Sequence, residues 1–453
     1  MLSSESSRPL PYDPRSTRVE LAVAERIRPT QSDPQNKYPI DAEISVNFKA
    51  CKLYSNSVAF LLRPATGKGF IGRKELVSEL VSELSSKNKI GFSLSGGRRI
   101  GKTSILREVE RQLTSKQHDI PVVYLSVWRV SPETVDQFIR ALNHATISAF
   151  QGRLPAQFRF EELLAAGTKA LARLLQNLKL SAGVGEDLEV SVSYVRGEKE
   201  DAGDALAKSF SLVEDMAKMV GKTCVLMLDE FPSLTDLTYG SKNQKIGESI
   251  IKLARTLYEE FEHTKLVISG SYRGTLENVA LKHSAPFYRQ LLLREVKPFD
   301  SSEYSAFLDH YLPEVRFTGD SKERLHRITS GIPYSLQLLA RQMSFKKIHQ
   351  VDTRQLNEVC QELLRDEGDL LFGEYVNDLS PSEVKVLRAL GKSPGARPNQ
   401  LAAEEFMDAR TVAYSLTLLQ RKGLIEREAR GNYRFTDNLF AEWLRVSDTL
   451  DQN

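Results

Sequence analysis

The sequence predicts an α/β fold with a parallel sheet, extended by helical units towards the C-terminus. Four short apolar runs predict buried strands, and they occupy residues 89–95, 121–127, 224–231 and 265–271. Amphipathic helical segments alternate with these runs, which is typical of a parallel sheet with helices on both faces. From Pro298 onward the pattern is helical, so further units follow the sheet.

The composition is that of an ordinary soluble globular protein. Its 453 residues are more than a single hydrophobic core usually supports, so two or three domains are expected. The 62 Lys and Arg residues nearly balance the 59 Asp and Glu residues, which argues against a strongly basic protein that binds nucleic acid through its overall charge. Cys51, Cys224 and Cys360 form no CxxC pair, and the chain has neither an apolar leader nor a long apolar run. We therefore expect a cytoplasmic protein without disulfides, structural zinc or membrane contact.

The region before the first predicted strand divides into three parts. Residues 1–36 are rich in Ser, Pro, Arg and Asp and predict a loose arm, whereas residues 38–63 carry β-prone runs. A helix is expected over 74–86, because apolar residues recur there on one helical face. Further along, residues 159–220 have a mostly helical pattern, interrupted at 178–197 by alternating Val residues that suggest a hairpin.

A glycine-rich phosphate-binding motif follows the first predicted strand. The pattern GxxxxGK[ST] is matched by Gly96, Gly97, Arg98, Arg99, Ile100, Gly101, Lys102 and Thr103, and Ser104 comes directly after it. The glycines let the loop wrap so that successive backbone N–H groups point at phosphate oxygens. A chance match is the competing interpretation. The predicted strand before the motif and the predicted helix after it favour a nucleotide-binding loop, since the motif requires that context.

The motif needs a second element that holds Mg²⁺ and activates water. Lys102 would bring positive charge to the β and γ phosphates, and the Thr103 hydroxyl would bind Mg²⁺. The apolar strand at 224–231 ends in Asp229, which would orient the Mg²⁺ shell, and Glu230, which would polarise the attacking water as general base. The alternative is an ordinary strand end with solvated acids. The upstream phosphate loop favours the catalytic interpretation.

Polar residues at the end of the next strand extend the candidate site. The run at 265–271 ends in Ser269 and Ser271, and we choose Ser271 as the side chain that would contact the γ-phosphate or the water; a simple strand-to-loop serine is the alternative. Three arginines follow, and each is a candidate finger that would act across a subunit boundary; they are Arg273, Arg289 and Arg294. Arg98 and Arg99 are expected to position the loop or contact a neighbouring segment.

The last unit has the element order of a winged helix-turn-helix. Three short helical segments precede two β-like pieces and a final helix between residues 380 and 453. The third helix would expose Arg410, Thr411, Tyr414, Arg421 and Lys422, while its buried face would hold Val412, Leu416 and Leu419. This unit has 11 Lys and Arg against 10 Asp and Glu, a weak basic footprint for a DNA reader. The charge count therefore makes DNA contact the less favoured interpretation of this unit.

Several motifs together resemble the archaeal-type ATPases, AAA+-related P-loop proteins of the STAND group. The resemblance is based on four segments. They are the phosphate loop, the acidic strand at 224–231, the stretch GFIGRKEL with Gly72, Arg73 and Glu75, and the GxP triplet that ends at Pro333. The resemblance, over residues 68 to 445, implies a P-loop core, a helical lid and bound ATP with Mg²⁺. It implies that Gly72 and Arg73 lie against the nucleotide base and that Pro333 couples the nucleotide to the lid.

Two departures from the family pattern limit what is carried over. The nuclease-like C-terminal domain of many relatives is not expected here. Arg289 lies where relatives often have a Gly-Arg pair, and the glycine is absent, so the finger role at Arg289 is a candidate only. The predicted domains are an N-terminal arm and β-rich segment (1–66), an ATPase core (67–298), a lid (299–378) and a winged helix (379–453).

The predicted function is a slow, Mg²⁺-dependent ATPase that works as a molecular switch. Nucleotide state would control the lid and winged helix, and through them self-association or contact with a separately encoded effector. A DNA-handling ATPase resembling origin-recognition or transposition regulators is the main alternative, and it would bind duplex DNA with a sharp salt dependence. A nucleotide-binding scaffold with negligible turnover is the third.

Overall fold

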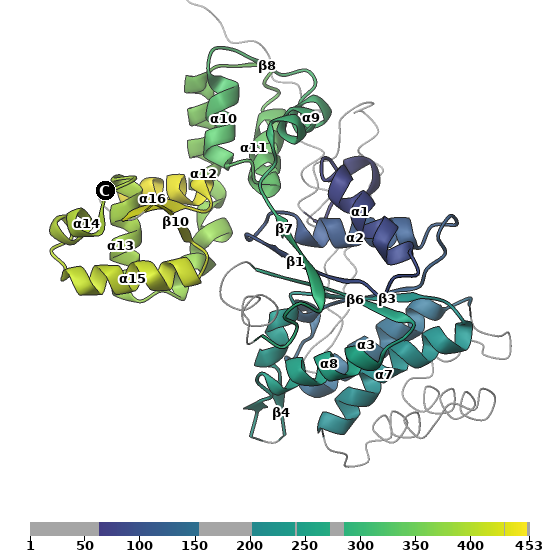
Figure 1. Cartoon of the computed structure of the whole chain (residues 1–453). Coiled ribbons are helices and arrows are strands. Elements are labelled where there is room, and N and C mark those ends of the chain that lie inside the picture. The colour runs from purple at the N-terminus through teal and green to yellow at the C-terminus, as the bar shows by residue number, and fades with distance from the viewer. Residues whose placement is uncertain (1–62, 154–201, 241, 272–284, 430, 451–453) are drawn as a thin grey trace, which may run out of the picture. The chain divides into compact units, whose positions relative to one another are not determined.

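The core of the protein is a five-stranded parallel sheet. The computed structural model describes residues 63–153, 202–240, 242–271, 285–429 and 431–450. The strand order is β2-β3-β6-β1-β7 and every neighbouring pair is parallel (Figure 1). The strands are β1 (Gly91–Gly96), β2 (Val122–Ser126), β3 (Cys224–Asp229), β6 (Thr264–Ser271) and β7 (Leu291–Val296). This confirms the predicted α/β class and all four predicted strands, and it adds β7.

Helices cover both faces of the sheet, which explains why the central strands are continuous apolar runs. Every residue of β1 and β3 is buried. Val225 and Met227 of β3 pack with α1 and α2, whereas Leu226 and Leu228 pack with α3, α7 and α8. Figure 1 shows these two helical layers on opposite sides of the strands. The helices are α1 (Lys74–Ser85), α2 (Lys102–Leu113), α3 (Val135–Phe150), α7 (Ala202–Val220) and α8 (Ser249–Glu260).

The parallel register brings the strand ends that carry the predicted site to one edge of the sheet. Ser126 pairs with Asp229 at the end of β2 and β3, and Gly96 pairs with both Ser271 and Val296 at the end of β1. The segments that leave β1 and β3 therefore emerge at the same edge of the sheet, on either side of β6, where open α/β sheets bind their ligands.

A helical lid follows β7. Its helices are α9 (Ser301–Tyr311), α10 (Ser321–Thr329), α11 (Pro333–Phe345) and α12 (Thr353–Asn377), with a two-residue parallel pairing of β8 (Arg316–Phe317) and β9 (Gln350–Val351). Asp300 and Asp352 begin α9 and α12 through capping boxes with Glu303 and Gln355. The helical pattern expected after Pro298 includes α12, which continues to Asn377 because Leu371 and Phe372 remain on its buried face.

The C-terminal unit is a winged helix, as predicted. Its elements are α13 (Pro381–Lys392), α14 (Pro398–Glu404), α15 (Ala409–Arg421), the antiparallel hairpin of β10 (Ile425–Ala429) and β11 (Asn432–Phe435), and α16 (Asn438–Leu450). On α15 the predicted apolar face is fully buried, comprising Val412, Leu416 and Leu419. Its predicted polar face is exposed, comprising Arg410, Thr411, Tyr414, Arg421 and Lys422.

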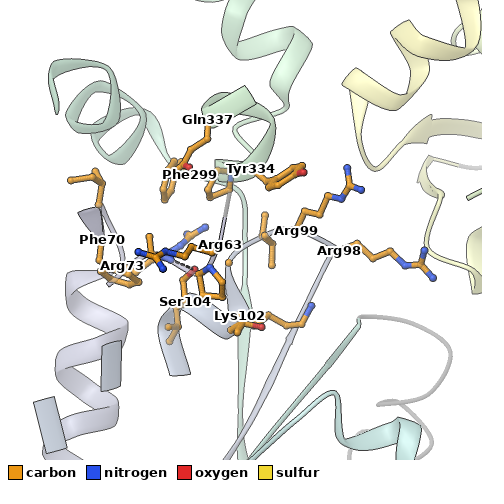
Figure 2. A pocket seen from close by; sticks show the side chains of 18 of the residues that line it. Arg63, Phe70, Arg73, Arg98, Arg99, Lys102, Ser104, Phe299, Tyr334 and Gln337 are labelled. Atoms are coloured by element: carbon orange, nitrogen blue, oxygen red, sulfur yellow. Dashed lines mark hydrogen bonds between the residues drawn. The ribbon is translucent and has the colours of Figure 1, made fainter. Parts of the chain in front are cut away.

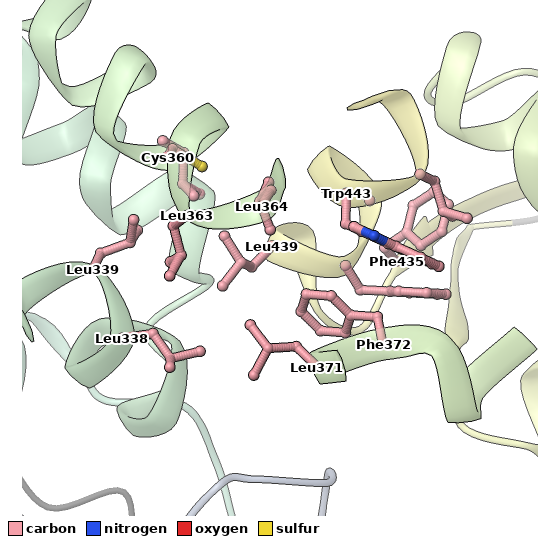
Figure 3. Close-up of a cluster of buried hydrophobic side chains, with 14 of the residues drawn as sticks. Leu338, Leu339, Cys360, Leu363, Leu364, Leu371, Phe372, Phe435, Leu439 and Trp443 are labelled. Carbon is pink, nitrogen blue, oxygen red and sulfur yellow. The ribbon is translucent and has the colours of Figure 1, made fainter. Parts of the chain in front are cut away.

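The lid and the winged helix share one hydrophobic core. A single cluster of buried side chains extends from Leu338 and Leu339 of α11, through α12, to Trp443 of α16 (Figure 3). Where α12 meets α16, the ring of Phe372 lies 5.5 Å from that of Phe440 and 5.8 Å from that of Trp443. The long helix α12 therefore joins the two units through packing as well as through the chain.

Some predictions fall outside the residues that the structure describes. These are the N-terminal arm and β-rich segment up to residue 62, and the hairpin at 178–197. Besides β7 and the β8–β9 pairing, the sequence did not predict α8 or the short hairpin of β4 (Thr238–Tyr239) and β5 (Gln244–Lys245). Within the described ranges, no helix combines the length and the apolar character needed to cross a membrane.

Candidate nucleotide-binding site

The predicted phosphate loop connects β1 to α2. Gly101 precedes α2 with a φ of +98°, a left-handed conformation that favours glycine. Gly96 is required for a different reason, because a Cβ there would lie 2.6 Å from the backbone oxygen of Val296 on the neighbouring strand. The two glycines of the motif thus serve loop curvature at one end and close strand packing at the other.

Lys102 is folded against the loop that precedes it. Its Nζ donates to the backbone oxygens of Gly96 at 3.1 Å and Gly97 at 3.0 Å, and the side chain is 5% exposed. Burial lowers the pKa of Lys102 from its usual range, although the nearby carboxylates of Glu230 and Asp229 oppose this shift. The ammonium group thus has only neutral acceptors at hydrogen-bond distance, and the anionic oxygens of a phosphate would stabilise it more strongly.

Asp229 lies at the centre of a hydroxyl network. Its Oδ2 accepts hydrogen bonds from Thr103 Oγ1 at 2.7 Å and Tyr124 OH at 2.8 Å, and its Oδ1 accepts from Ser269 Oγ. Asp229 is 2% exposed. A carboxylate and a hydroxyl in direct contact are the hard oxygen donors that Mg²⁺ prefers, so the residues present fit the predicted magnesium site.

Glu230 projects into the cavity from the end of β3. Its backbone has a φ of +53°, and its N–H donates to Ser269 Oγ at 3.2 Å. Its carboxylate Oε1 lies 3.9 Å from Lys102 Nζ. A carboxylate next to the lysine of the phosphate loop is placed as a general base for water attack requires.

A cavity of about 850 Å³ joins the loop to the lid (Figure 2). This volume is within the range of small-molecule sites. The walls come from five places, namely the stretch 63–73, the phosphate loop and start of α2, Trp128 and Glu133 after β2, Glu230, and the lid. The stretch 63–73 is attached to α2, because Ala65 N–H donates to Ser104 Oγ at 3.1 Å and Gly67 N–H donates to Glu108 Oε2 at 2.8 Å.

Arg73 links the cavity wall to the lid. Its backbone N–H donates to Glu303 Oε1 at 2.6 Å, its Nη1 lies 3.2 Å from Glu303 Oε2, and its guanidinium lies 4.8 Å from the centre of the Phe299 ring. Burial lowers the pKa of Arg73, partly offset by Glu303 and Asp300. Gly72 does not line the cavity, since it packs against Phe299 and Glu303.

The two arginines of the loop turn towards α12. Arg99 Nη2 donates to the backbone oxygen of Leu371 at 2.7 Å, and its guanidinium lies 4.7 Å from the ring centre of Tyr334 and 5.4 Å from those of Phe372 and Tyr375. Arg98 lies 5.0 Å from the Tyr375 ring centre. Figure 2 shows both side chains directed away from Lys102. The sequence left open whether these arginines position the loop or contact another segment, and they contact α12.

The structure brings most predicted site residues together, but not all of them. The cavity is lined by Arg73, Arg98, Arg99, Ile100, Gly101, Lys102, Thr103, Ser104, Glu230 and Pro333. Asp229 lies behind this wall and reaches it through Thr103. Arg289 does not line the cavity, and its guanidinium lies 5.3 Å from the ring centre of the adjacent Tyr288. Arg294 is paired with Glu79, and Arg273 and the Ser271 side chain lie outside the described residues.

Sequence reasoning missed two residues around Asp229. Ser269, which it passed over in favour of Ser271, contacts both Asp229 and the Glu230 backbone. Tyr124 of β2 donates to Asp229, and burial raises the pKa of its hydroxyl. The sequence signal for Ser269 and Tyr124 is that each is a polar residue inside an apolar strand. This signal points to Asp229 only when the order of the strands in the sheet is known. Ser126 pairs with Asp229 in the sheet, which is what places Tyr124 within reach.

Comparisons with known proteins agree with this geometry. A family model described as an ATPase domain predominantly from Archaea matches residues 70–339, and a MarR family model matches residues 377–432. The chain is similar in fold to a Walker-type ATPase of Pyrococcus abyssi, with a TM-score of 0.61 and 20% identity, over 85% of this chain and 99% of that one. It is also similar to the ORC2 protein of Aeropyrum pernix, with a TM-score of 0.48 and 13% identity, over 84% and 92%. No curated protein matches the sequence significantly.

Proposed function

We propose that this chain, which belongs to the family of ATPase domains found predominantly in Archaea, is an ATP-driven molecular switch of the STAND type. It would bind and slowly hydrolyse ATP, and the state of the nucleotide would control the position of the lid and winged helix. We propose the same domain boundaries as the sequence predicts, so that the ATPase core ends near residue 298 and the lid ends near residue 378. It includes a cytoplasmic location, which is supported by three widely spaced cysteines without a CxxC pair.

The contact between Arg99 and Leu371 carries this proposal. Arg99 belongs to the loop expected to wrap the phosphates, and Leu371 belongs to the helix that joins the lid to the winged helix. A change in loop conformation would therefore alter a direct hydrogen bond and two arginine–aromatic contacts on α12, and a third such contact with Tyr334 of α11. A ligand shifts a conformational equilibrium only through contacts that differ between states, and a change in these contacts would supply such a difference.

The residues of the site divide the work of phosphate binding. Lys102 would exchange its bonds to the Gly96 and Gly97 carbonyls for bonds to phosphate oxygens, which carry more negative charge. Thr103 and Asp229 would hold Mg²⁺, which neutralises charge on the phosphates when bound. The N-terminus of α2, preceded by Gly101, adds backbone N–H groups.

Glu230 would carry the hydrolytic step as general base. Its carboxylate would accept a proton from the attacking water while Ser269, bonded to the Glu230 backbone, keeps the chain in its left-handed turn. The distance of 3.9 Å to Lys102 places both groups at the same end of the cavity. Ser271 and Arg289 remain proposed contributors, the latter from a neighbouring copy of the chain.

Hydrogen exchange tests the switch. ATP with Mg²⁺ is expected to change the exchange of residues 371–378 in the parent chain. In Arg99→Ala the same addition should leave this segment unchanged, while ATP still binds at Lys102. Arg427→Ala, an exposed arginine of the wing outside the loop, serves as control and should behave as the parent. If ATP binds to the parent but changes exchange only within the sheet unit, the switch is rejected.

The output of the switch would be self-association or contact with a separately encoded protein. Sizing the chain with and without ATP separates these possibilities: growth in particle size with ATP alone supports self-association, and an unchanged size favours an effector.

ATP-dependent DNA binding is the second candidate function. The MarR family match and the exposed polar face of α15 favour it. Ion pairs within the winged helix argue against DNA binding, because they neutralise basic side chains that would contact phosphates. Arg434 pairs with Glu426 and Glu428, and Lys422 lies 2.8 Å from Glu383. Duplex affinity that falls steeply with salt would support DNA handling, and absent or salt-insensitive binding would reject it.

A further inference from the structure

An amide oxygen without a hydrogen-bond partner lies in the lid wall of the cavity. Gln337 of α11 is 8% exposed, it lines the cavity, and its Oε1 has no hydrogen-bond partner among the described residues. Figure 2 shows Gln337 on the lid side, across the cavity from Lys102 and Ser104. A buried carbonyl oxygen left unpaired is unfavourable, so a ligand that presents a donor here would gain from pairing with it.

Two hydrogen bonds fix the orientation of the Gln337 amide. The Tyr311 hydroxyl donates to the backbone oxygen of Gly69 at 2.9 Å, and Gln337 Nε2 donates to the Tyr311 oxygen at 3.2 Å. A backbone carbonyl can only accept, so Tyr311 must use its single proton on Gly69. Gln337 must then present its NH₂ group to Tyr311. Oε1 is left as a fixed acceptor, and the orientation is set by the network as a whole.

The surroundings of this acceptor suit a flat base. The rings of Phe307 and Tyr311 lie 4.6 Å apart at an angle of 32°, and the Phe299 ring lies 6.2 Å from that of Phe307. These three side chains line the cavity together with Phe70 and Ile71 of the stretch 63–73. Aromatic faces bind nucleobases by stacking without distinguishing one base from another. Discrimination between bases must come from a polar group, and Gln337 is placed to supply it.

We propose that Gln337 is a specificity-determining residue that selects adenine nucleotides. Its Oε1 accepts a hydrogen bond from the 6-amino group of adenine. A 6-oxo purine, such as hypoxanthine or guanine, would instead place its own acceptor against Oε1 and leave both oxygens unpaired. Tyr311 is a positioning residue, because it prevents the amide from rotating to offer its NH₂ group. This inference rests on the proposed function, since it assumes that a nucleotide base occupies this end of the cavity.

Binding of nucleoside diphosphates tests the proposal without interference from hydrolysis. Adenosine diphosphate and inosine diphosphate differ at the 6-position, where one carries an amino group and the other an oxygen. The full-length parent is expected to bind the adenosine compound at least about tenfold more tightly in calorimetry with Mg²⁺, the size of effect typical of a buried polar group left unpaired. Purine riboside diphosphate, which lacks a 6-substituent, should fall between the two.

Two variants separate selection from general binding. Gln337→Leu should weaken the binding of adenosine diphosphate. It should also reduce the preference of the protein for adenosine diphosphate over inosine diphosphate to about twofold or less. Tyr311→Phe frees the amide to rotate, so inosine diphosphate should gain affinity while adenosine diphosphate still binds. Tyr304→Phe is the matched control on the same helix, because its hydroxyl donates to the Lys322 backbone at 2.7 Å and does not line the cavity. It should keep the parent preference.

Three outcomes would overturn the inference. Equal binding of both diphosphates by the parent means that Oε1 is paired by water in the bound state. An unchanged preference in Gln337→Leu assigns base selection to the backbone of the stretch 63–73. A parent preference for the inosine compound means that the amide has the opposite orientation. Binding of neither diphosphate would instead reject the proposed function, and the inference would fall with it.

Discussion

Thr103 Oγ1 donates a 2.7 Å hydrogen bond to Asp229 Oδ2, across 126 positions of sequence. One side chain follows the phosphate loop and the other ends β3, and the parallel register brings them together at one sheet edge. The pair therefore lies where a metal ion bound to the phosphates would be held.

Asp229→Asn removes the charge of this pair while keeping the size of the side chain. We expect the Mg²⁺-dependent part of ATP affinity to fall about 10- to 100-fold, with little change in the presence of a chelator. Calorimetry with and without Mg²⁺ measures this difference. Thr103→Ser keeps the hydroxyl and should retain the metal dependence. An Asn variant with the full Mg²⁺ effect would contradict the assignment of the site.

Lys102→Ala is expected to abolish ATP binding, because the only buried cation directed at the loop carbonyls is removed from the described site. Lys252→Ala on α8 is the control, since that side chain is exposed and lies outside the cavity. Equilibrium binding with a fluorescent ATP analogue reads the result, and thermal unfolding confirms that the variant is folded. Parent-like affinity in Lys102→Ala would show that the loop does not bind phosphate.

Glu230→Gln should bind ATP normally and lose turnover by at least about 100-fold, which is the lower range for loss of a general base. Phosphate release under single-turnover conditions is the measurement. Glu133→Gln offers a matched control, because Glu133 also lines the cavity but belongs to another segment. If Glu230→Gln still hydrolyses ATP at the parent rate, Glu230 is not the general base. If the parent itself shows no measurable hydrolysis, the chain is a nucleotide-binding scaffold and the proposed ATPase activity is rejected.

The carboxyl group of Asp437 predicts a pH dependence of stability. Burial raises its pKa to about 6, although backbone N–H groups of Leu439 and Phe440 and the charge of Arg99 oppose the rise. The folded state thus holds this proton at pH values where the unfolded chain, with a pKa of 3.8, has lost it. The free energy of unfolding should therefore fall as pH rises from about 4 to about 6, by at most about 3 kcal/mol.

Denaturant unfolding at about pH 4 and about pH 7 measures this fall. Asp437→Asn cannot ionise and should show a smaller one. Arg99→Ala should extend the fall to higher pH, because Arg99 lowers the pKa of Asp437. Identical pH profiles for the parent and Asp437→Asn would show that this carboxyl group does not control the slope.

The sequence predicted four of the five strands of the sheet and missed β7, at one edge, for a physical reason. Buried parallel strands are continuous apolar runs, and the runs before Gly96 and Asp229 were recognised as such. β7 lies at the edge of the sheet, where Leu292 and Leu293 are each 42% exposed, and its mixed pattern does not stand out. α8 was also missed, although its buried face shows helical spacing.

The chemistry of the site was predictable where it depends on local spacing. Lys102, Thr103, Asp229 and Glu230 all lie at the expected sheet edge. The partners of Arg99 were not predictable, because they depend on how a helix some 270 residues further along packs over the loop. Pairings of this kind are set by tertiary packing and leave no periodic trace in the sequence.

The hydrogen bond from Arg99 to Leu371 also constrains how any partner of the winged helix must behave. Coupling free energy between two binding sites is reciprocal, so the factor by which ATP changes the affinity for the partner equals the factor by which the partner changes the affinity for ATP. A cell extract can therefore be fractionated by a simple assay, namely its effect on nucleotide dissociation from the purified chain. Fractions that slow dissociation from the parent but leave Arg99→Ala unaffected contain a molecule that acts through this bond.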